Sequence, residues 1–171
     1  MTFAAGSIVI EPLAAHHDRR SFQCGHEALD RYLREHAGQD VRRGIARVFV
    51  ATAADSTSRV LGFFTLSATS VTTSQLPAEM ARRLPRHPVP AALLGRLGVD
   101  RSVARRGLGG ILLADAIKRT LTASAAVAIA VIVVDPIDEA ARSFYAAHGF
   151  SSLEGPEQRL FLTLTARPAN S

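Results

Sequence analysis

Cysteine is almost absent from this chain of 171 residues, because Cys24 is the only one. A single thiol excludes an intramolecular disulfide and a metal site built from clustered cysteines. The six histidines are scattered and show no spacing typical of metal ligands. We therefore expect no metal, and we expect the reducing environment of the cytoplasm.

Long hydrophobic runs are also missing. The longest, Ala123–Val134, is shorter than the ~20 residues that a membrane span needs. The N-terminus has no basic segment ahead of a long apolar stretch. The sequence predicts neither a membrane anchor nor a signal peptide.

Lysine is nearly absent as well, since Lys118 is the only one, and the net charge of +5 comes almost entirely from arginine. Two explanations are open at this point. A genome rich in G and C favours arginine codons, whereas a phosphate-rich partner favours arginine because its guanidinium binds phosphate through paired hydrogen bonds. The positions of the arginines have to decide between them.

Length and composition are those of a single globular domain, which we assign to residues 1–171. Hydrophobic residues make up 47% of the chain and charged residues 20%, an ordinary balance for a folded protein. The sequence contains no internal repeat, no low-complexity tract and no linker that would separate two domains.

Strands and helices alternate along the chain. Apolar and β-branched runs predict strands at Ser7–Leu13, Ile45–Thr52, Val60–Ser67, Leu93–Val99, Val127–Val134 and Leu160–Thr165. Helical spacing and breaker residues predict helices at His26–Gly38, Ala78–Leu84, Leu108–Leu121 and Ile137–His148. This order indicates a mixed α/β sheet.

The first predicted helix is amphipathic. Its apolar spacing comes from Leu29, Tyr32, Leu33 and His36. Asp30 and Glu35 are expected on its solvent side.

The segment Arg105–Gly110 (RRGLGG) follows a predicted strand and opens a predicted helix. Its glycines allow a tight turn and a close approach of the backbone to a ligand. Free N–H groups at the helix start, with the positive end of the helix dipole, suit an anion such as a pyrophosphate. Arg105 and Arg106 add charge for further phosphate groups.

With the preceding Leu97-Gly98-Val99-Asp100, this segment resembles the acetyl-CoA motif of the GNAT acetyltransferase superfamily. The resemblance implies a mixed central sheet whose splayed strand pair holds acetyl-CoA, with helices on both faces. It implies that the cofactor is bound by Leu97, Gly98, Val99, Arg105, Arg106, Gly107, Leu108, Gly109, Gly110 and Ser143. The family's Gln or Arg at the head of the motif falls here on Ala104, a departure for which we expect Arg105 or Arg106 to compensate.

A second segment, Ala140–Phe150 (AARSFYAAHGF), resembles the GNAT segment that carries a tyrosine near the cofactor sulfur. The resemblance implies that Tyr145 is the general acid. A neutral phenol, with an ordinary pKa near 10, can protonate the departing thiolate. From the residues alone, an aromatic packing role for Tyr145 stays open.

Further short segments between Phe22 and Phe161 resemble the GNAT toxins of bacterial type II toxin–antitoxin pairs, which acetylate the amino group of aminoacyl-tRNA and stop translation. They are Phe22–Leu33, Arg42–Gly44, Val48–Ala51, Leu61–Ser67 and Pro85–Pro90. This resemblance implies an aminoacyl-tRNA substrate and a ribbon-helix-helix antitoxin as partner, and it leaves open a homodimer.

The toxin resemblance also gives the arginines a place beside the acceptor groove, where tRNA phosphates would bind. The expected nucleic-acid-binding residues are Arg34, Arg42, Arg43, Arg47, Arg82, Arg83, Arg86 and Arg96. A merely solvated helix face is the alternative explanation for them.

The implied reaction is direct acetyl transfer. The backbone of Leu97–Val99 would polarise the thioester carbonyl, and no carboxylate base stands at a predictable position. An α-amine, with a pKa of about 7.7–8.0, is partly neutral at cell pH and needs none. Two alternatives stay open: a GNAT enzyme for a small-molecule amine or a protein N-terminus, and a non-enzymatic RNA-binding module on the same fold.

Overall fold

A computed structural model describes residues 2–84 and 86–164; Pro85 and Thr165 therefore lie outside the described residues. The chain divides into two compact units, Met1–Ser67 with Arg96–Ala116, and Ala68–Gly95 with Ile117–Ser171. Three elements, β3 (Gly62–Val71), β4 (Val89–Val99) and α4 (Leu108–Ala123), run from one unit into the other.

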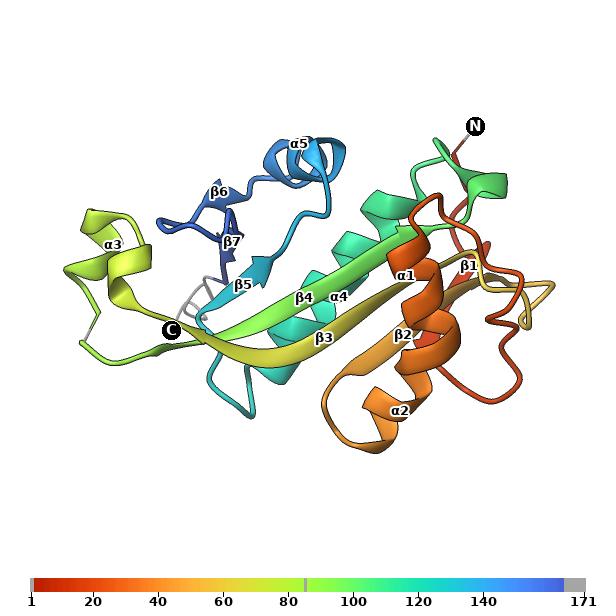
Figure 1. Ribbon diagram of the computed structural model, residues 1–171, viewed down its shortest axis with the longest axis horizontal. Helices are drawn as coiled ribbons and strands as arrows, with labels where there is room; N and C mark the ends of the chain where they lie inside the picture. The colour runs from red at the N-terminus through yellow and green to blue at the C-terminus, as the bar shows by residue number, and fades with distance from the viewer. Residues whose placement is uncertain (1, 85, 165–171) are drawn as a thin grey trace. The chain divides into compact units, whose positions relative to one another are not determined.

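The first unit is built on antiparallel strands. β1 (Ile8–Pro12) pairs with β2 (Arg47–Ala53), β2 pairs with β3, and β4 follows β3 in the strand order (Figure 1). The Asp100 N–H continues this alignment by donating to the Leu61 carbonyl at 2.8 Å. The predicted first strand and hairpin are confirmed.

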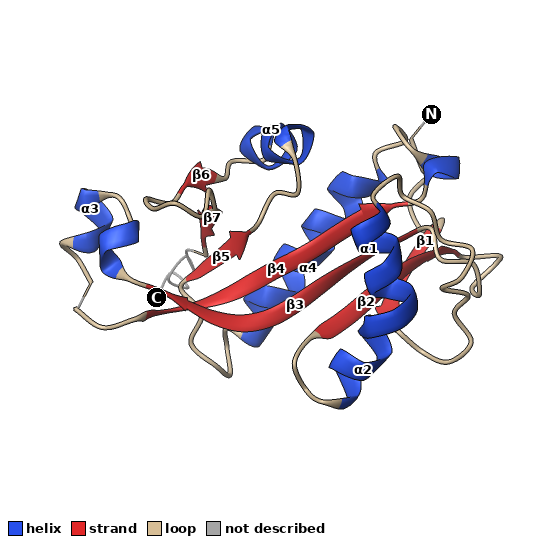
Figure 2. Cartoon of the chain, viewed as in Figure 1, coloured by secondary structure: helices blue, strands red, loops and turns tan. Residues whose placement is uncertain are grey.

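Adjacent residues of β3 show that helices cover both faces of this sheet, because successive strand residues point to opposite sides. Phe63 packs edge-to-face on Phe22 at 5.4 Å and stacks on Tyr32 at 6.4 Å. Gly62 faces α4, where a Cβ would lie 2.8 Å from Leu112 Cδ1. Figure 2 shows α1 (Glu27–Arg31) and α2 (Ala37–Arg42) packed over β2 and β3. The prediction of helices on both faces is confirmed.

The first helical segment is longer than predicted and contains a π-helical turn, η1 (Tyr32–His36), between α1 and α2. Leu29 and Leu33 are buried as predicted, but His36 is exposed and Ala37 takes its place in the core. A π turn inserts an extra residue, which moves the apolar face on by one position.

Asp30 corrects a second expectation about this helix. It is buried, with 6% exposure, instead of lying on the solvent side. Its carboxylate accepts a hydrogen bond from the Cys24 N–H at 2.9 Å, which satisfies the buried charge. Glu35 is exposed as predicted.

The second unit contains the first part of β4, which pairs in parallel with β5 (Val131–Val134). β7 (Leu160–Thr163) pairs antiparallel with β5 and with the short β6 (Ser151–Ser152), which was not predicted. α3 (Ala78–Ala81) is shorter than predicted, η2 (Thr73–Gln75) precedes it, and α5 (Glu139–Ala147) lies within the predicted range. β5 begins at Val131, later than the predicted Val127, and the Val127 N–H belongs to the turn after α4, where it donates to the Ala123 carbonyl at 3.0 Å.

The parallel pairing is short. It joins Ala91–Leu94 to Val131–Val134 and ends there, while β4 continues to Val99. The whole of β5 is paired with β4, and the sheet has strands of mixed direction, as expected from the sequence. No helix within the described residues is long and apolar enough to cross a membrane.

Candidate active site

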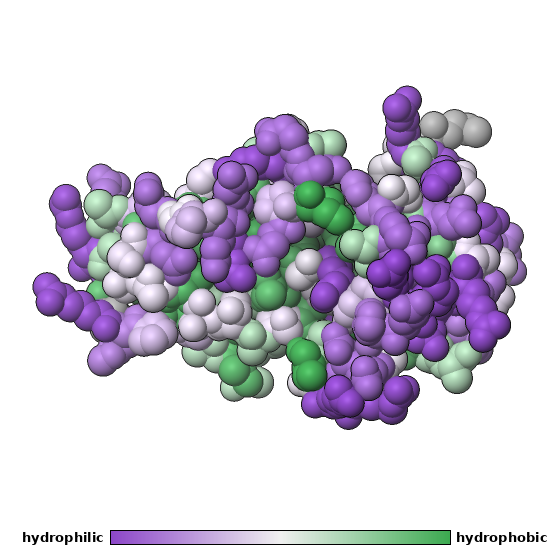
Figure 3. Space-filling model, in the orientation of Figure 1, coloured by the Kyte–Doolittle hydropathy of each residue, from purple (hydrophilic) through white to green (hydrophobic). Residues whose placement is uncertain are grey.

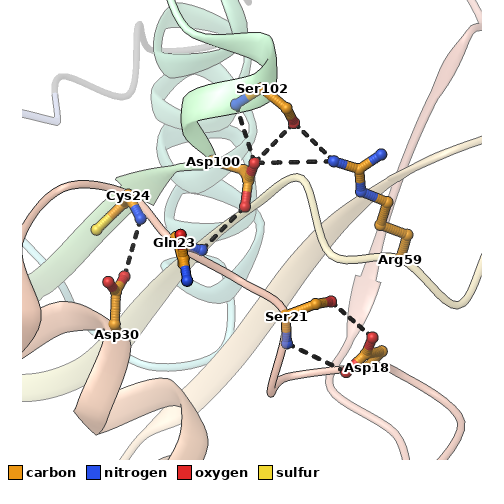
Figure 4. Close-up of polar contacts among 8 residues, drawn as sticks. All are labelled: Asp18, Ser21, Gln23, Cys24, Asp30, Arg59, Asp100 and Ser102. Carbon is orange, nitrogen blue, oxygen red and sulfur yellow. Dashed lines mark hydrogen bonds and ion pairs between the residues drawn. The ribbon is translucent and has the colours of Figure 1, made fainter.

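The Asp100 carboxylate organises the turn that follows β4 (Figure 4). Its Oδ2 accepts the Gln23 N–H at 2.9 Å, and its Oδ1 accepts the Ser102 N–H at 3.0 Å and the Ser102 hydroxyl at 2.6 Å. Arg59 donates to Ser102 Oγ at 2.8 Å and lies 3.9 Å from Asp100 Oδ1. In return, the Arg101 N–H donates to the Gln23 carbonyl at 2.8 Å. One carboxylate thus joins the segment before α1 to the turn leading into α4.

Burial of Asp100 opposes its charge, and hydrogen bonds overcome that effect. Desolvation by itself would raise the pKa of Asp100, but the hydrogen bonds from Ser102 and Gln23, with the charge of Arg59, hold the pKa below its ordinary value. The group is therefore ionised at neutral pH. Sequence reasoning recognised Asp100 as part of a motif but assigned it no role.

The turn itself has an unusual backbone. After η3 (Arg101–Val103), Arg105 has φ of 62° and Gly107 has φ of 82°. A left-handed conformation costs a non-glycine residue roughly 1 kcal/mol or more, and such strain concentrates at functional sites. Of the three glycines in the motif, only Gly107 needs its conformational freedom, because Gly109 and Gly110 lie in the first turn of α4.

The start of α4 has the form of an anion site. The Ile111 N–H bonds to the Gly107 carbonyl at 3.2 Å, so the N–H groups of Leu108, Gly109 and Gly110 precede the first intrahelical bond. Helix geometry gives these three groups no carbonyl partner inside the helix, and the helix dipole adds positive potential there. The residues present therefore fit the pyrophosphate of a nucleotide cofactor.

The two arginines of the motif are placed differently. Arg105 is exposed, whereas the Arg106 guanidinium lies over the Phe3 ring at 4.0 Å from its centre. The N-terminal tail also reaches Gly107, where a Cβ would lie 3.7 Å from the Thr2 methyl. This packing of the tail on the motif was not predicted from the sequence.

The end of β4 presents Leu97, Gly98 and Val99. Gly98 is buried, and a Cβ there would lie 3.2 Å from Phe63 and 3.4 Å from Phe22. The glycine marks a close approach, and the neighbours that need the space are aromatic side chains of the same unit.

The second unit carries Tyr145 on α5. Asp138 caps this helix by accepting the Ala141 N–H at 2.8 Å. Tyr145 is 5% exposed, and its ring packs edge-to-face on Phe144 and Phe150. Burial raises the pKa of Tyr145 above its ordinary value, so the phenol keeps its proton at neutral pH. Ser143, two residues earlier on α5, is exposed.

The predicted nucleic-acid-binding arginines of the first unit fall into two groups. Arg42, Arg43 and Arg47 are exposed and form no side-chain ion pair with any described residue. Arg34 is instead held by Glu27 at 3.4 Å. The surface over α1 and α2 is largely hydrophilic (Figure 3).

Arg96 is held in a stack. Its guanidinium lies 3.6 Å from the centre of the Tyr32 ring, a cation–π contact. The Tyr32 hydroxyl donates to Asp40 Oδ2 at 2.9 Å. Burial, together with this hydrogen bond, raises the pKa of Tyr32 to about 12.

In the second unit, Arg82, Arg83 and Arg86 are exposed.

Glu11, His16 and His17 bring three potential metal ligands within 4.8 Å of one another. His17 Nε2 lies 2.8 Å from Glu11 Oε1, and its Nδ1 accepts the Ala14 N–H at 2.9 Å. Because Nδ1 is an acceptor, the ring proton sits on Nε2, the atom that a metal would need. A metal-bound histidine has the opposite arrangement, with its second nitrogen as donor. We interpret the group as a hydrogen-bonded contact that positions His17.

Comparison with known proteins identifies the family. The profile of the acetyltransferase (GNAT) family matches residues 13–150. The chain belongs to the GNAT family. It is an acetyl-CoA-dependent N-acetyltransferase.

The GNAT chain has relatives that match nearly its whole length. It is 38% identical over 154 residues to a tRNA-acetylating toxin of Mycobacterium tuberculosis. The matched residues cover 90% of this chain and 89% of that protein. Among solved structures, AtaT complexed with acetyl-methionyl-tRNAfMet has a TM-score of 0.86 at 33% identity, over 91% of this chain and 94% of that one. A tyrosine-to-phenylalanine mutant of KacT has a TM-score of 0.87 at 32% identity, over 92% and 95%.

Replacement of Asp100 by asparagine tests the carboxylate network of this GNAT chain. A folded-state pKa below the unfolded value of about 3.9 means that the carboxylate stabilises the fold above that pH, and that this contribution is lost as pH falls through the folded pKa. We expect Asp100→Asn to lower the free energy of unfolding by about 1–3 kcal/mol at pH 7 and the deficit to shrink below about pH 4. Urea unfolding across a pH series measures it, with exposed Asp55→Asn as control. A deficit that does not change with pH would contradict this role.

A glutamate at Gly109 tests the anion site. Gly109 lies in the first helical turn without a positive φ, so a side chain there is compatible with the backbone, and an acidic group near a helix start favours the fold. The same carboxylate would repel the pyrophosphate, and we expect Gly109→Glu to abolish acetyl-CoA binding in calorimetry without unfolding the protein. Gly109→Ala, which adds a Cβ without charge, is the matched control. Normal binding by a folded Gly109→Glu protein would remove this assignment.

Proposed function

We propose that this acetyltransferase is a toxin that acetylates the α-amino group of aminoacyl-tRNA and thereby blocks translation. The observation that carries the proposal is the match to a tRNA-acetylating toxin at 38% identity over 90% of this chain, which includes the acceptor side as well as the cofactor motif. The exposed, unpaired arginines Arg42, Arg43 and Arg47 support it, because tRNA is bound largely through its phosphates.

The cofactor residues are assigned on the same basis. Acetyl-CoA, when bound, supplies an acetyl group activated as a thioester. The N–H groups of Leu108, Gly109 and Gly110 bind its pyrophosphate, and the exposed Arg105 guanidinium binds a further phosphate group, which makes up for Ala104. Backbone N–H groups of Leu97–Val99 hold the thioester carbonyl, where negative charge develops during attack. Arg106, whose guanidinium lies over the Phe3 ring, fixes the shape of the turn. Ser143, which is exposed on α5, is a further cofactor-binding residue in this proposal.

Tyr145 supplies the proton that the reaction needs. With acetyl-CoA bound, the amine nitrogen would replace the sulfur on the acetyl carbon, and the Tyr145 hydroxyl would donate its proton to that sulfur. The proton that the amine nitrogen gives up would return to the Tyr145 oxygen, which balances the transfer. The raised pKa of Tyr145 keeps this hydroxyl protonated over the physiological range. An α-amine with a pKa of about 7.7–8.0 arrives partly neutral, so attack proceeds without a carboxylate base.

We further propose that residues 1–171 act as one cytoplasmic domain. Three elements, β3, β4 and α4, continue through both compact units, and a unit cut from the rest would lose part of each. The toxin assignment includes inhibition by a ribbon-helix-helix antitoxin, and assembly as a homodimer. Transfer to a small-molecule amine is the rival activity, and it gives the exposed arginines no task.

Acetylation of charged tRNA tests the function. We expect the purified protein to transfer acetyl groups to aminoacyl-tRNA, detected by mass spectrometry of nuclease digests, and the affinity for tRNA to fall steeply with salt because neutralised phosphates release counterions. The double variant Arg42→Ala/Arg43→Ala should bind tRNA more weakly, with a shallower salt dependence and unchanged acetyl-CoA affinity. Preferential acetylation of free amines, or a flat response to salt, would overturn the tRNA assignment.

Replacement of Tyr145 by phenylalanine tests the acid. The ring packing is kept and only the proton donor is removed, so kcat should fall by roughly 10²-fold or more while acetyl-CoA affinity changes little. Single-turnover kinetics on aminoacyl-tRNA, together with calorimetry, separate the two effects. Phe144→Leu, which alters a neighbouring ring but not the hydroxyl, is the control. Wild-type turnover in the Tyr145→Phe enzyme would reduce Tyr145 to a packing residue.

A further inference from the structure

The second unit contains a cavity of about 530 Å³. Pockets for small molecules and cofactors measure roughly 300–1,000 Å³, so this one has room for a single nucleotide but is far larger than a lone phosphate needs. Its lining combines three kinds of side chain: hydroxyl groups, guanidinium groups and small apolar groups. They come from Thr73, Ser74, Ala81, Arg82, Leu84 and Arg86.

The hydroxyl side of the cavity is held by fixed local structure. Thr72 and Gln75 form a capping box around η2, the turn that carries Thr73 and Ser74. The Gln75 carbonyl also accepts the Glu154 N–H at 2.8 Å, which ties this turn to the segment after β6. Leu76 anchors the turn in the core at 3% exposure. Ser74 Oγ is hydrogen-bonded to Thr72 Oγ1 at 3.0 Å, so its remaining hydrogen-bonding capacity, and the Thr73 hydroxyl, lie on a pre-organised turn.

The charge of the segment that lines the cavity favours an anion, with Glu154 as an acidic residue on the neighbouring segment. Between Ala68 and Gly95, the chain contains three arginines and a single acidic residue, Glu79. Arg82 and Arg86 line the cavity, and neither forms a side-chain ion pair with a described residue. Arg83 is equally exposed and adjacent in sequence, yet it is not part of the lining.

We propose that this cavity binds one nucleotide of a single-stranded RNA end. Its phosphate lies between the guanidinium groups of Arg82 and Arg86 and the hydroxyls of η2, where paired N–H donors suit phosphate oxygens. Its base lies against Leu84 and Ala81, since unpaired bases are recognised by burial of their faces and edges in pockets. The inference rests on the proposed function and deepens it, because it assigns the cavity to the unpaired end of the tRNA substrate.

Three single variants separate a built pocket from a general basic surface. Arg82→Ala and Arg86→Ala should each raise the KM for aminoacyl-tRNA about tenfold or more, the usual effect of losing a hydrogen bond to a charged group, with kcat and acetyl-CoA affinity unchanged. Arg83→Ala removes the same charge from outside the lining and should have a much smaller effect, so the proposal departs here from the sequence-based expectation that Arg83 also binds nucleic acid. Arg82→Lys keeps the charge but not the paired donors, and it should restore only part of the affinity. An Arg83→Ala effect equal to the other two would overturn the pocket in favour of a diffuse basic surface.

If the wild-type protein acetylates no aminoacyl-tRNA, the proposed function is wrong, but that result does not test nucleotide binding in the cavity. Direct titration tests that binding. The full-length protein is titrated with adenosine and cytidine 5′-monophosphates and with inorganic phosphate, and its amide NMR shifts are followed. Binding of a nucleotide that perturbs Thr73 and Ser74, is absent in the Arg82→Ala/Arg86→Ala protein and persists in Arg83→Ala supports the cavity assignment. Equal binding of inorganic phosphate, or no binding of either nucleotide, overturns it.

Discussion

The Asp100 carboxylate is the constraint on which the cofactor side of the first unit depends. It is buried, and it accepts hydrogen bonds from two segments distant in sequence, before α1 and after β4. A buried charge is tolerated only when it has hydrogen-bond partners, so both segments must keep their positions for the carboxylate to stay buried in its ionised form. The turn that follows holds Arg105 in a left-handed conformation, which an unanchored loop would relax. The strain at Arg105 and the charge at Asp100 are therefore linked features, and together they set where α4 begins.

Two missing side chains complete this arrangement. Gly62 leaves room for Leu112 of α4, and a Cβ there would also come within 3.1 Å of the Gly98 carbonyl, which cannot move independently of its strand. Gly98 in turn leaves room for Phe22 and Phe63. Neighbouring strands thus use one glycine to admit the helix on one face and another to admit aromatic rings on the opposite face. Close packing makes such positions intolerant of even a methyl group, because core atoms relax only partly around an insertion.

The sequence predicted most elements and the fold class because apolar periodicity and breaker residues are local signals. It could not predict features that depend on distant partners. Helical spacing predicts Asp30 on the solvent side of its helix. The side chain is instead buried, where its carboxylate accepts the Cys24 N–H from a segment outside the helix. Ala37 lies in the core in place of His36, because the π turn shifts the apolar face by one position. No single residue of the sequence predicts such a turn. β6 is only two residues long and owes its assignment to β7. Likewise, the glycines and arginines of the motif predicted an anion site from the sequence. The packing of Phe3 on Arg106 and the hydrogen bonds to Asp100 could not be predicted, because they join residues that meet only in the folded chain.

The placement of the arginines bears on the question that composition left open. Codon bias affects how many arginines a chain contains. It does not favour particular surfaces for arginines that lack an ion-pair partner. Arg34 and Arg96 are engaged by Glu27 and by the Tyr32 ring, so their charge is partly committed within the fold. Arg42, Arg43 and Arg47, and separately Arg82 and Arg86, are exposed and have no such partner among the described residues, so their N–H donors are available. In the second unit, the guanidinium groups of Arg82 and Arg86 line a pocket together with the hydroxyl-bearing residues Thr73 and Ser74, a combination suited to a phosphate group. The same protein retains a buried phenol that stays protonated where an α-amine is already partly neutral. In the proposed reaction, the proton donor and the attacking amine would both be in their reactive forms at the same pH, which is the condition that a transfer without a carboxylate base requires.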